Sequence, residues 1–298
     1  MSLAVLSYGG GQDSTALLLM YINDPDFRRK YASEDFVVVH AATGNEHVQT
    51  DRHVQYTKTL CQQHGIEFHH LTPDRGFHSD KWPDLLSFYR RTKTCGSKAF
   101  NKTCTDRLKL QPIYRWLSDW VSRKYGMPTF GHPFKSKTPL VEYARLYGKI
   151  TMIIGIAGDE TKRAVGNWEG EPKWQQLSVT KAYPLIDSNM NRQACQDYIR
   201  SVGEEVPLPS NCMVCPFMSE QELLWLYYFE RQMYDEWVVI ERIKLEANAH
   251  LGDRNLGVWG RKTLPEVLER ALKRYGHMTP AQLNEYKMSH GHCLMSKY

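Results

Sequence analysis

A run of small and polar residues near the N-terminus has the composition of an anion-binding turn. Residues 7–14 read Ser-Tyr-Gly-Gly-Gly-Gln-Asp-Ser. Successive glycines permit positive φ angles, and a helix that begins directly after them points its first backbone N–H groups at a bound anion. Asp13 and Ser14 stand where a carboxylate and a hydroxyl could also contact a phosphate or its metal ion. The run predicts a phosphate-binding loop, although the glycines alone would also suit an ordinary strand-to-helix turn.

Two later segments place polar residues directly after predicted strands. In residues 42–46, Ala-Thr-Gly-Asn-Glu, the small residues would let a purine lie against the backbone, and Asn45 and Glu46 could bond hydroxyl groups. In residues 158–163, Gly-Asp-Glu-Thr-Lys-Arg, Asp159 could hold Mg²⁺, and Lys162 or Arg163 could neutralise a leaving pyrophosphate. Taken alone, the first segment is also compatible with a surface turn and the second with a solvated charge cluster at a helix start.

A fourth segment, which we also expect at a strand end, runs from Cys104 to Ile113. Arg107 and Lys109 within it are candidates for contacts with an anion. The alternative is the start of a plain amphipathic helix.

The cysteines suggest a metal centre. Cys212-Met-Val-Cys215-Pro is a CxxC motif, which lets two sulfurs face one metal from a tight turn. A Cys₄ site needs two more thiolates, and Cys95 and Cys104 are the best candidates. Iron–sulfur and zinc centres both accept four cysteines, so the ligands do not separate them. The other cysteines are Cys61 and Cys195, expected to be buried in amphipathic helices, and Cys293, a reactive thiol or a spare.

These residues need a scaffold that brings strand ends together, and the apolar pattern supplies one. Short apolar runs predict strands at 3–7, 36–40, 66–71 and 150–156, with helices at 14–23 and 50–64 between them. This alternation predicts an α/β fold with a doubly wound, mostly parallel sheet, whose ligands bind beyond the carboxyl ends of the strands. Further helices are expected at 108–125, 191–202, 219–248, 265–275 and 280–287.

The same pattern suggests how the chain is divided. Residues 1–217 are expected to form the α/β nucleotide-binding domain, including a cysteine-bearing insertion at about 75–148, and residues 218–298 a helical C-terminal region. Within the insertion, a loop is expected from Met127 to Pro139. Trp116 and Trp120 lie four residues apart on one helix face, which favours core packing over base stacking.

Bulk composition is that of an ordinary soluble chain. The 298 residues are 42% hydrophobic and 24% charged, with a net charge of +5. No apolar run reaches the roughly 20 residues that a membrane span needs. We expect a cytoplasmic protein without a membrane partner, and the mild positive charge is compatible with a nucleotide or nucleic acid.

Residues 7–14 lack the lysine of the P-loop motif and the spacing of the dinucleotide fingerprint. They resemble instead the SGGxDS loop of the PP-loop ATP pyrophosphatases, or adenine nucleotide alpha hydrolase-like superfamily, with one residue inserted after Ser7. Further similar segments are 39–46, 104–113, 154–163, 183–186 and 212–217, in the family's order. Together they look like the phosphoadenosine phosphosulfate reductase-like branch, closest in motifs to DNA-phosphorothioation-type sulfurtransferases.

The resemblance implies an enzyme that cleaves ATP to AMP and pyrophosphate with Mg²⁺, and so activates a nucleic acid or nucleotide for transfer of sulfur or another group. It implies a [4Fe-4S] cluster, with zinc as the alternative, on Cys95, Cys104, Cys212 and Cys215. It also allows a sulfur donor such as a cysteine desulfurase, and a homodimer. The implied catalytic residues are Asp13, Asp159, Lys162 and Arg163. The implied nucleotide-binding residues are Ser7, Gly9, Gly10, Gly11, Gln12, Asp13, Ser14, Ala42, Thr43, Gly44, Glu46 and Gly158.

Two alternatives remain open within the resemblance. A sulfonucleotide reductase releases sulfite with a cysteine in a C-terminal Glu-Cys-Gly motif, whereas this chain has His292-Cys293-Leu294. That difference weakens the reductase reading. The other alternative is a non-catalytic nucleotide-binding subunit of a modification system.

Overall fold

The computed structural model describes residues 2–100, 103–131, 136–164 and 171–290. Its centre is a five-stranded sheet in the order β3-β2-β1-β4-β5, in which every neighbouring pair is parallel. The strands are β1 (Leu3–Ser7), β2 (Asp35–Ala41), β3 (Glu67–Leu71), β4 (Ile150–Ile154) and β5 (Val179–Ala182). The predicted α/β fold with a parallel sheet is confirmed. The strand order reverses between β1 and β4, where doubly wound folds bind their ligands.

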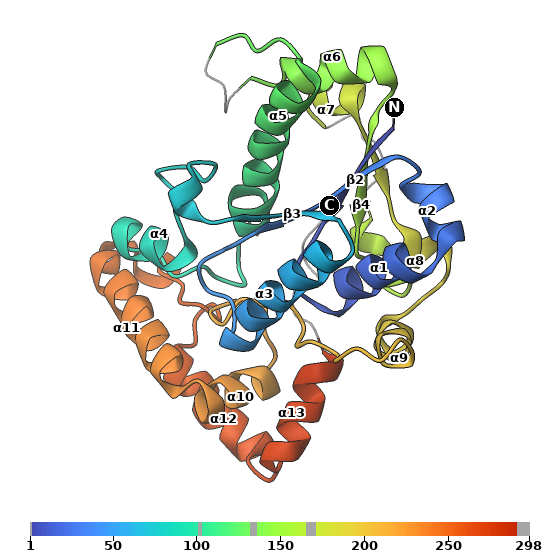
Figure 1. The fold of residues 1–298 in the computed structure, drawn as a ribbon. Helices are drawn as coiled ribbons and strands as arrows, with labels where there is room; N and C mark the ends of the chain where they lie inside the picture. The colour runs from blue at the N-terminus through green and yellow to red at the C-terminus, as the bar shows by residue number, and fades with distance from the viewer. Residues whose placement is uncertain (1, 101–102, 132–135, 165–170, 291–298) are drawn as a thin grey trace.

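Helices cover both faces of this sheet (Figure 1). The α-helices are α1 (Gln12–Asn23), α2 (Pro25–Tyr31), α3 (Val48–Gln63), α4 (Leu85–Thr92), α5 (Gln111–Tyr125), α6 (Thr138–Tyr147), α7 (Lys173–Ser178), α8 (Pro184–Asp187), α9 (Arg192–Ser201), α10 (Glu220–Phe229), α11 (Arg231–Ala247), α12 (Leu264–Tyr275) and α13 (Pro280–Ser289).

Alternate residues of each strand feed two separate cores. Ala4 and Leu6 of β1 pack in the core that holds α1, α3 and α9. Leu3 and Val5 pack on the other face, in the core that holds α5 and α6. This alternation is what a strand covered on both faces requires, because successive side chains point to opposite sides.

A third core joins the C-terminal helices to α4 and to the segment that carries the CxxC motif. It contains Leu85, Leu108 and Val214 together with buried residues of α10, α11, α12 and α13. Residues on both sides of position 217 therefore share one core, while the predicted domain boundary at that position stays a prediction.

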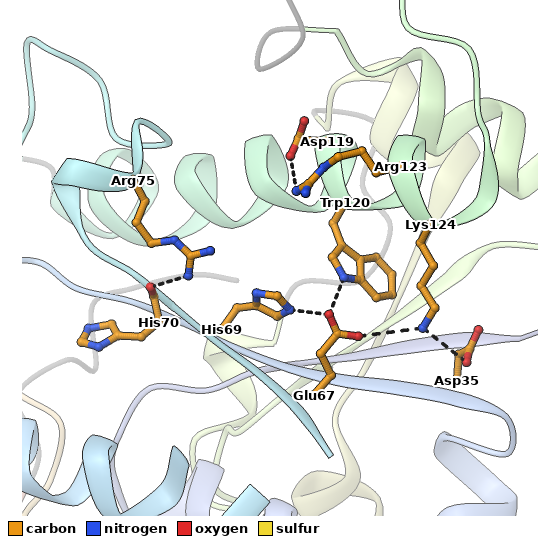
Figure 2. A network of polar contacts seen from close by, with 9 residues as sticks. All are labelled: Asp35, Glu67, His69, His70, Arg75, Asp119, Trp120, Arg123 and Lys124. Carbon is orange, nitrogen blue, oxygen red and sulfur yellow. Dashed lines mark hydrogen bonds and ion pairs between the residues drawn. The ribbon is translucent and has the colours of Figure 1, made fainter. Parts of the chain in front are cut away.

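Glu67, the first residue of β3, holds the amino-terminal end of that strand to α5. Its carboxylate accepts a hydrogen bond from Trp120 Nε1 at 2.7 Å and lies 2.6 Å from His69 Nε2, as Figure 2 shows. Lys124 Nζ lies 3.9 Å from the same carboxylate and 3.6 Å from that of Asp35. Trp116 and Trp120 are buried, which confirms the prediction that they pack in the core.

The elements differ from the prediction in a few places. The strand β5 was not predicted, because its four residues include exposed Thr180 and the half-buried Lys181. The expected helical region 219–248 is two helices, since Glu230, with φ −132°, ends α10 and begins α11. The segment from Cys104 to Ile113 follows no strand in the described residues. It forms a π-helical turn, Asp106–Leu110, that leads into α5. Of these described residues, no helix is long and apolar enough to cross a membrane.

Candidate nucleotide-binding site

The glycine run connects β1 to α1 as predicted, and its local geometry is that of an anion cradle. Gly10 has φ +74°, a conformation that favours glycine. The first N–H groups of an α-helix have no acceptor within the helix. Gly11, the N-cap of α1, has no side chain that could supply one. Ser14 Oγ accepts from Gly9 N at 3.1 Å and donates to Gly11 O at 3.1 Å, which fixes the turn.

Two glycines beside this turn allow neighbouring backbone segments to approach it closely. A Cβ atom on Gly11 would lie 2.7 Å from Ser210 N, so the loop before the CxxC motif packs directly on the glycine run. A Cβ atom on Gly155 would lie 2.9 Å from Ser14 N. The end of β4 therefore lies against the start of α1, at the reversal of strand order.

A cavity of about 80 Å³ opens at this place, and we call it the loop cavity. Its walls come from the glycine run, the ends of β2 and β4, α5, the start of α9 and the loop at 209–211. The lining residues are Ser7, Tyr8, Gly9, Gly11, Gln12, Asp13, Ser14, Ala41, Lys109, Ile113, Ile154, Gly155, Arg163, Arg192, Pro209, Ser210 and Asn211. Ser7, Gly9, Gly11, Gln12, Asp13, Ser14 and Arg163, all predicted from the sequence, are thus brought together.

The charged groups of the loop cavity lie close enough to act on one another electrostatically. Burial raises the pKa of Asp13 to about 6, although Arg192 and Arg163 act to lower it. Asp13 Oδ1 is buried and has no hydrogen-bond partner in the described structure. Glu160 holds the two arginines in place, because its carboxylate pairs with Arg163 and lies 3.0 Å from Arg192 Nη2. The cavity therefore combines one carboxylate with the cations of Arg163, Arg192 and Lys109.

Other predicted residues lie beside this cavity and do not line it. Asp159 and Lys162 are exposed on the loop after β4. Gly158 lies deeper and donates its N–H to Met190 O at 2.6 Å, which joins this loop to the start of α9. Gly10 sits below the turn, where a Cβ atom would lie 3.1 Å from methyl carbons of Thr50 and Val54.

The segment 42–46 faces the cysteines. Glu46 is buried and uses its carboxylate within its own loop, accepting from Thr43 N at 2.8 Å, from Thr43 Oγ1 at 2.6 Å and from Asn45 N at 3.2 Å. Thr43 Oγ1 lies 3.3 Å from Cys212 Sγ. Gly44, with φ +72°, packs on Asp84 at the start of α4, and Ala42 is buried.

Two adjoining cavities bring the four predicted cysteines into one region. Cys104, Cys212 and Cys215 line the first, which we call the cysteine cavity, together with Thr43, Lys109 and Ser210. Cys95 and Cys104 line the second. Lys109 and Ser210 also line the loop cavity, so these two residues separate the cysteines from the glycine run.

The hydroxyl of Tyr89 lies within electrostatic reach of all four thiols. Burial raises the pKa of Tyr89 well above its usual value, and Cys104, Cys215, Cys212 and Cys95 each raise it further. Burial also raises the pKa of Cys95 and of Cys212 to about 12, and Lys109 partly offsets this effect at Cys212. The thiols thus lie in an apolar environment with a phenol among them.

The arrangement bears on which metal centre the thiols suit. Among the described residues, no group of three or more His, Cys, Asp or Glu side chains converges closely enough to hold a metal ion. A single zinc ion bound by four cysteines would need sulfurs about 2.3 Å from one point. An iron–sulfur cluster contains more than one iron atom, so its cysteine ligands stand farther apart than those of a single zinc ion.

Several residues of the site were not predicted. Arg192, Ser210 and Asn211 line the loop cavity, although they lie almost 200 residues beyond the glycine run in the sequence. The only local signal was the position of Arg192 at the start of a predicted amphipathic helix. Cys293 lies outside the described residues.

Comparisons with known proteins add little information about the function. No model of a protein family matches the sequence. No curated protein matches it either. Among solved structures, the chain is similar to the U34-tRNA thiolase NcsA from Methanococcus maripaludis, which was solved with its [4Fe-4S] cluster. The TM-score is 0.37 and the sequence identity 13%, over 100% of this chain and 80% of that chain. A similarity this low supports no conclusion about function.

Proposed function

We propose that the protein is an ATP-dependent enzyme that transfers AMP to an oxygen atom of a nucleotide or nucleic acid and releases pyrophosphate. The main support for this proposal is the loop cavity. It joins the open N-terminus of α1 to a buried, unpartnered carboxylate oxygen of Asp13 and to the cations of Arg163 and Arg192.

The residues fit a triphosphate and its metal ion. The first N–H groups of α1 and the guanidinium groups of Arg163 and Arg192 would hold the β- and γ-phosphates. Mg²⁺ is usually bound by one or two carboxylates, with the remaining ligands supplied by phosphates and water. Asp13 meets that need, with exposed Asp159 as the second candidate. Lys162 would act on the outer side of the pyrophosphate, and the segment 42–46 would contact the nucleoside.

The proposed reaction is a displacement at the α-phosphorus of ATP. An oxygen of the acceptor forms a bond to that phosphorus, and the bond to the bridging oxygen between the α- and β-phosphates breaks. The electron pair leaves with pyrophosphate, and the acceptor carries AMP. Negative charge grows on the leaving group, so cations already fixed by Glu160 lower the barrier without having to reorganise.

The cysteines would act on the activated acceptor. Cys95, Cys104, Cys212 and Cys215 would hold a [4Fe-4S] cluster, with zinc as the alternative, and an iron–sulfur cluster would supply iron and sulfide for sulfur transfer. Lys109 and Ser210 line both the loop cavity and the cysteine cavity, and Thr43 lies beside Cys212 in the cysteine cavity. They would orient an acceptor that reaches both. Sulfide would form the new bond to the acceptor, and AMP would leave with the electron pair of the broken bond. A donor such as a cysteine desulfurase, together with a two-electron thiol reductant, would restore the sulfide.

The test is to identify the products formed from ATP. Anaerobically purified protein is incubated with Mg²⁺, single-stranded nucleic acid and ATP labelled at either the α- or the γ-phosphate. Labelled AMP, free or attached to the acceptor, and labelled pyrophosphate are expected. Asp13→Asn should abolish both products, whereas Asp197→Asn, on the exposed face of α9, should not. ADP with phosphate, or ATP binding without turnover on any acceptor, contradicts the proposal.

A further inference from the structure

A second cavity adjoins the loop cavity. It has a volume of about 380 Å³, which falls in the range of about 300–1,000 Å³ typical of small-molecule sites. Ser7, Ile113 and Ile154 line both cavities. A molecule bound in this second cavity would therefore lie next to the phosphates held at the glycine run. We call it the aromatic cavity.

The walls of the aromatic cavity suit a flat ring. Tyr114 of α5 and Trp174 of α7 face each other edge to face, with ring centroids 5.1 Å apart. Leu110, Met152 and Ile154 complete an apolar surface. Trp174 is only half-buried, so part of its ring remains available to a ligand. Stacking on an aromatic side chain is the usual way in which proteins hold an unpaired nucleobase.

Polar groups at the same cavity match the edge of a base. Gln111 and Gln175 line it and offer amide donors and acceptors, and Asp106 offers a carboxylate. Gln111 Nε2 donates to Asp106 Oδ2 at 2.8 Å, which fixes the direction of that amide. Amide and carboxylate groups of this kind read the hydrogen-bonding edge of a base.

Two cations of the aromatic cavity are not neutralised by a carboxylate in any contact of the described residues. Lys137 Nζ donates to Tyr114 O at 2.9 Å, and Arg115 Nη1 donates to Phe77 O at 3.0 Å. Lys181, in contrast, is paired with Glu171. Lys137 Nζ also lies 5.6 Å from the centroid of the Trp174 ring. A phosphate bound by Lys137 and Arg115 would therefore lie beside a stacked base.

From this arrangement we infer that the aromatic cavity binds a nucleotide unit of the acceptor, with its base against Trp174 and its own phosphate on Lys137 and Arg115. The nucleoside of ATP is a poorer match, because its phosphates would be held at the glycine run and it would bring no phosphate for these two cations. The inference rests on the proposed function, since it names where the acceptor of that reaction binds. A strand of nucleic acid and a free nucleotide share this chemistry.

Binding is measured without ATP and Mg²⁺, so that the result does not depend on turnover. A fluorescently labelled single-stranded oligonucleotide is titrated with the protein at low salt, and a nucleoside monophosphate is tested as a competitor. Trp174→Ala should weaken binding at least about fivefold, while Trp174→Phe, which keeps a ring, should largely retain it. Lys137→Gln should weaken binding and reduce its salt dependence by about 0.7 in log–log slope. Lys149→Gln and Tyr228→Ala, at exposed positions away from the cavity, serve as matched controls.

The outcomes separate this inference from the proposed function. Tight strand binding with weak monophosphate competition identifies nucleic acid as the source, and equal binding of the monophosphate identifies a free nucleotide. Saturating pyrophosphate should fill the loop cavity without displacing either ligand. The inference is overturned if the wild-type protein binds neither ligand, or if the Trp174 and Lys137 variants bind as the controls do. Release of AMP and pyrophosphate by those variants would then still support the proposed reaction.

Discussion

The side-chain amide of Gln12 donates a hydrogen bond to the backbone carbonyl of Met288 at 3.1 Å, which fastens the glycine run to α13. The same amide donates to Pro207 O at 3.0 Å, and Gln196 Nε2 donates to Gln12 Oε1 at 3.1 Å. One side chain of the predicted phosphate-binding loop thus joins α1, α9, α13 and the loop before the CxxC motif.

We expect Gln12→Leu to destabilise the protein by about 1–3 kcal/mol, because Pro207 O would lose its donor and the buried amide of Gln196 would lose an acceptor. Gln12 is 2% exposed, so water cannot replace the amide. Urea denaturation monitored by circular dichroism gives the free energy of unfolding. Gln193→Leu, an exposed glutamine on α9, is the control and should change it little. An equal effect of the two substitutions would show that the Gln12 network does not stabilise the fold.

A pair of glycine substitutions tests the close packing of the loop. In Gly11→Ala the new Cβ would lie 2.7 Å from the backbone nitrogen of Ser210, whereas in Gly9→Ala the nearest atom is the Ser210 hydroxyl at 3.2 Å. A backbone segment cannot move as a hydroxyl can. We therefore expect Gly11→Ala to lower pyrophosphate affinity by at least about tenfold, roughly 1.4 kcal/mol, and Gly9→Ala to lower it much less. Isothermal titration calorimetry with pyrophosphate distinguishes these outcomes from equal losses, which would mean that the spacing is not critical.

Arg192 lines the loop cavity but was not predicted from the sequence. Its substitution by glutamine removes a charge that faces the proposed phosphates, and hydrogen bonds to charged groups contribute about 1.5–3 kcal/mol. Arg192→Gln should therefore weaken pyrophosphate binding by about 10- to 150-fold. Arg200→Gln changes an exposed arginine of the same helix and is the matched control. Unchanged affinity in Arg192→Gln would remove this residue from the anion site.

The glycine run could be predicted from the sequence, whereas Arg192 could not. The glycine run carries its own signal, because adjacent residues build the turn, and the parallel sheet could be expected from the alternation of apolar runs. Arg192 and Ser210 reach the cavity only through the packing of α9 and of the loop at 209–211. Nothing in their neighbouring residues encodes that long-range contact.

At Glu46 the sequence predicted the position of the residue after β2, but it did not predict where the carboxylate points. Its position after β2 suggested contact with a ligand, but the carboxylate satisfies N–H groups of its own loop. Buried backbone donors need acceptors, and a carboxylate three residues away supplies one. The short strand β5 was missed for a related reason: its pairing with β4, rather than its apolar content, makes it a strand.

The cysteine assignment predicts a specific loss of metal. Cys212→Ser should reduce the iron and acid-labile sulfide of anaerobically purified protein, because Cys212 lines the cavity shared with Cys104 and Cys215. Pyrophosphate binding should remain within about twofold, an effect near 0.4 kcal/mol, since the loop cavity has other walls. Cys61→Ala, in the core behind α3, should leave the iron content unchanged. Iron retained in Cys212→Ser, or zinc in place of iron in the wild-type protein, would contradict the cluster.

Lys137 makes acceptor binding depend on pH. Burial, together with the charge of the neighbouring Arg115, lowers the pKa of its ammonium group to about 8. The phenol of Tyr114, which also faces the cavity, stays protonated because burial raises its pKa. Lys137 is therefore charged below about pH 8 and neutral above it. Because a phosphate favours the charged form, oligonucleotide affinity should be constant below pH 7.5 and fall as the pH rises through 8 to 9.5. A bound phosphate raises the pKa of Lys137, so the fall in affinity should extend above the pKa of the free protein.

Lys137→Arg, whose guanidinium stays protonated, should bind with nearly constant affinity over the whole range. A wild-type profile as flat as that of Lys137→Arg would exclude Lys137 as the phosphate contact.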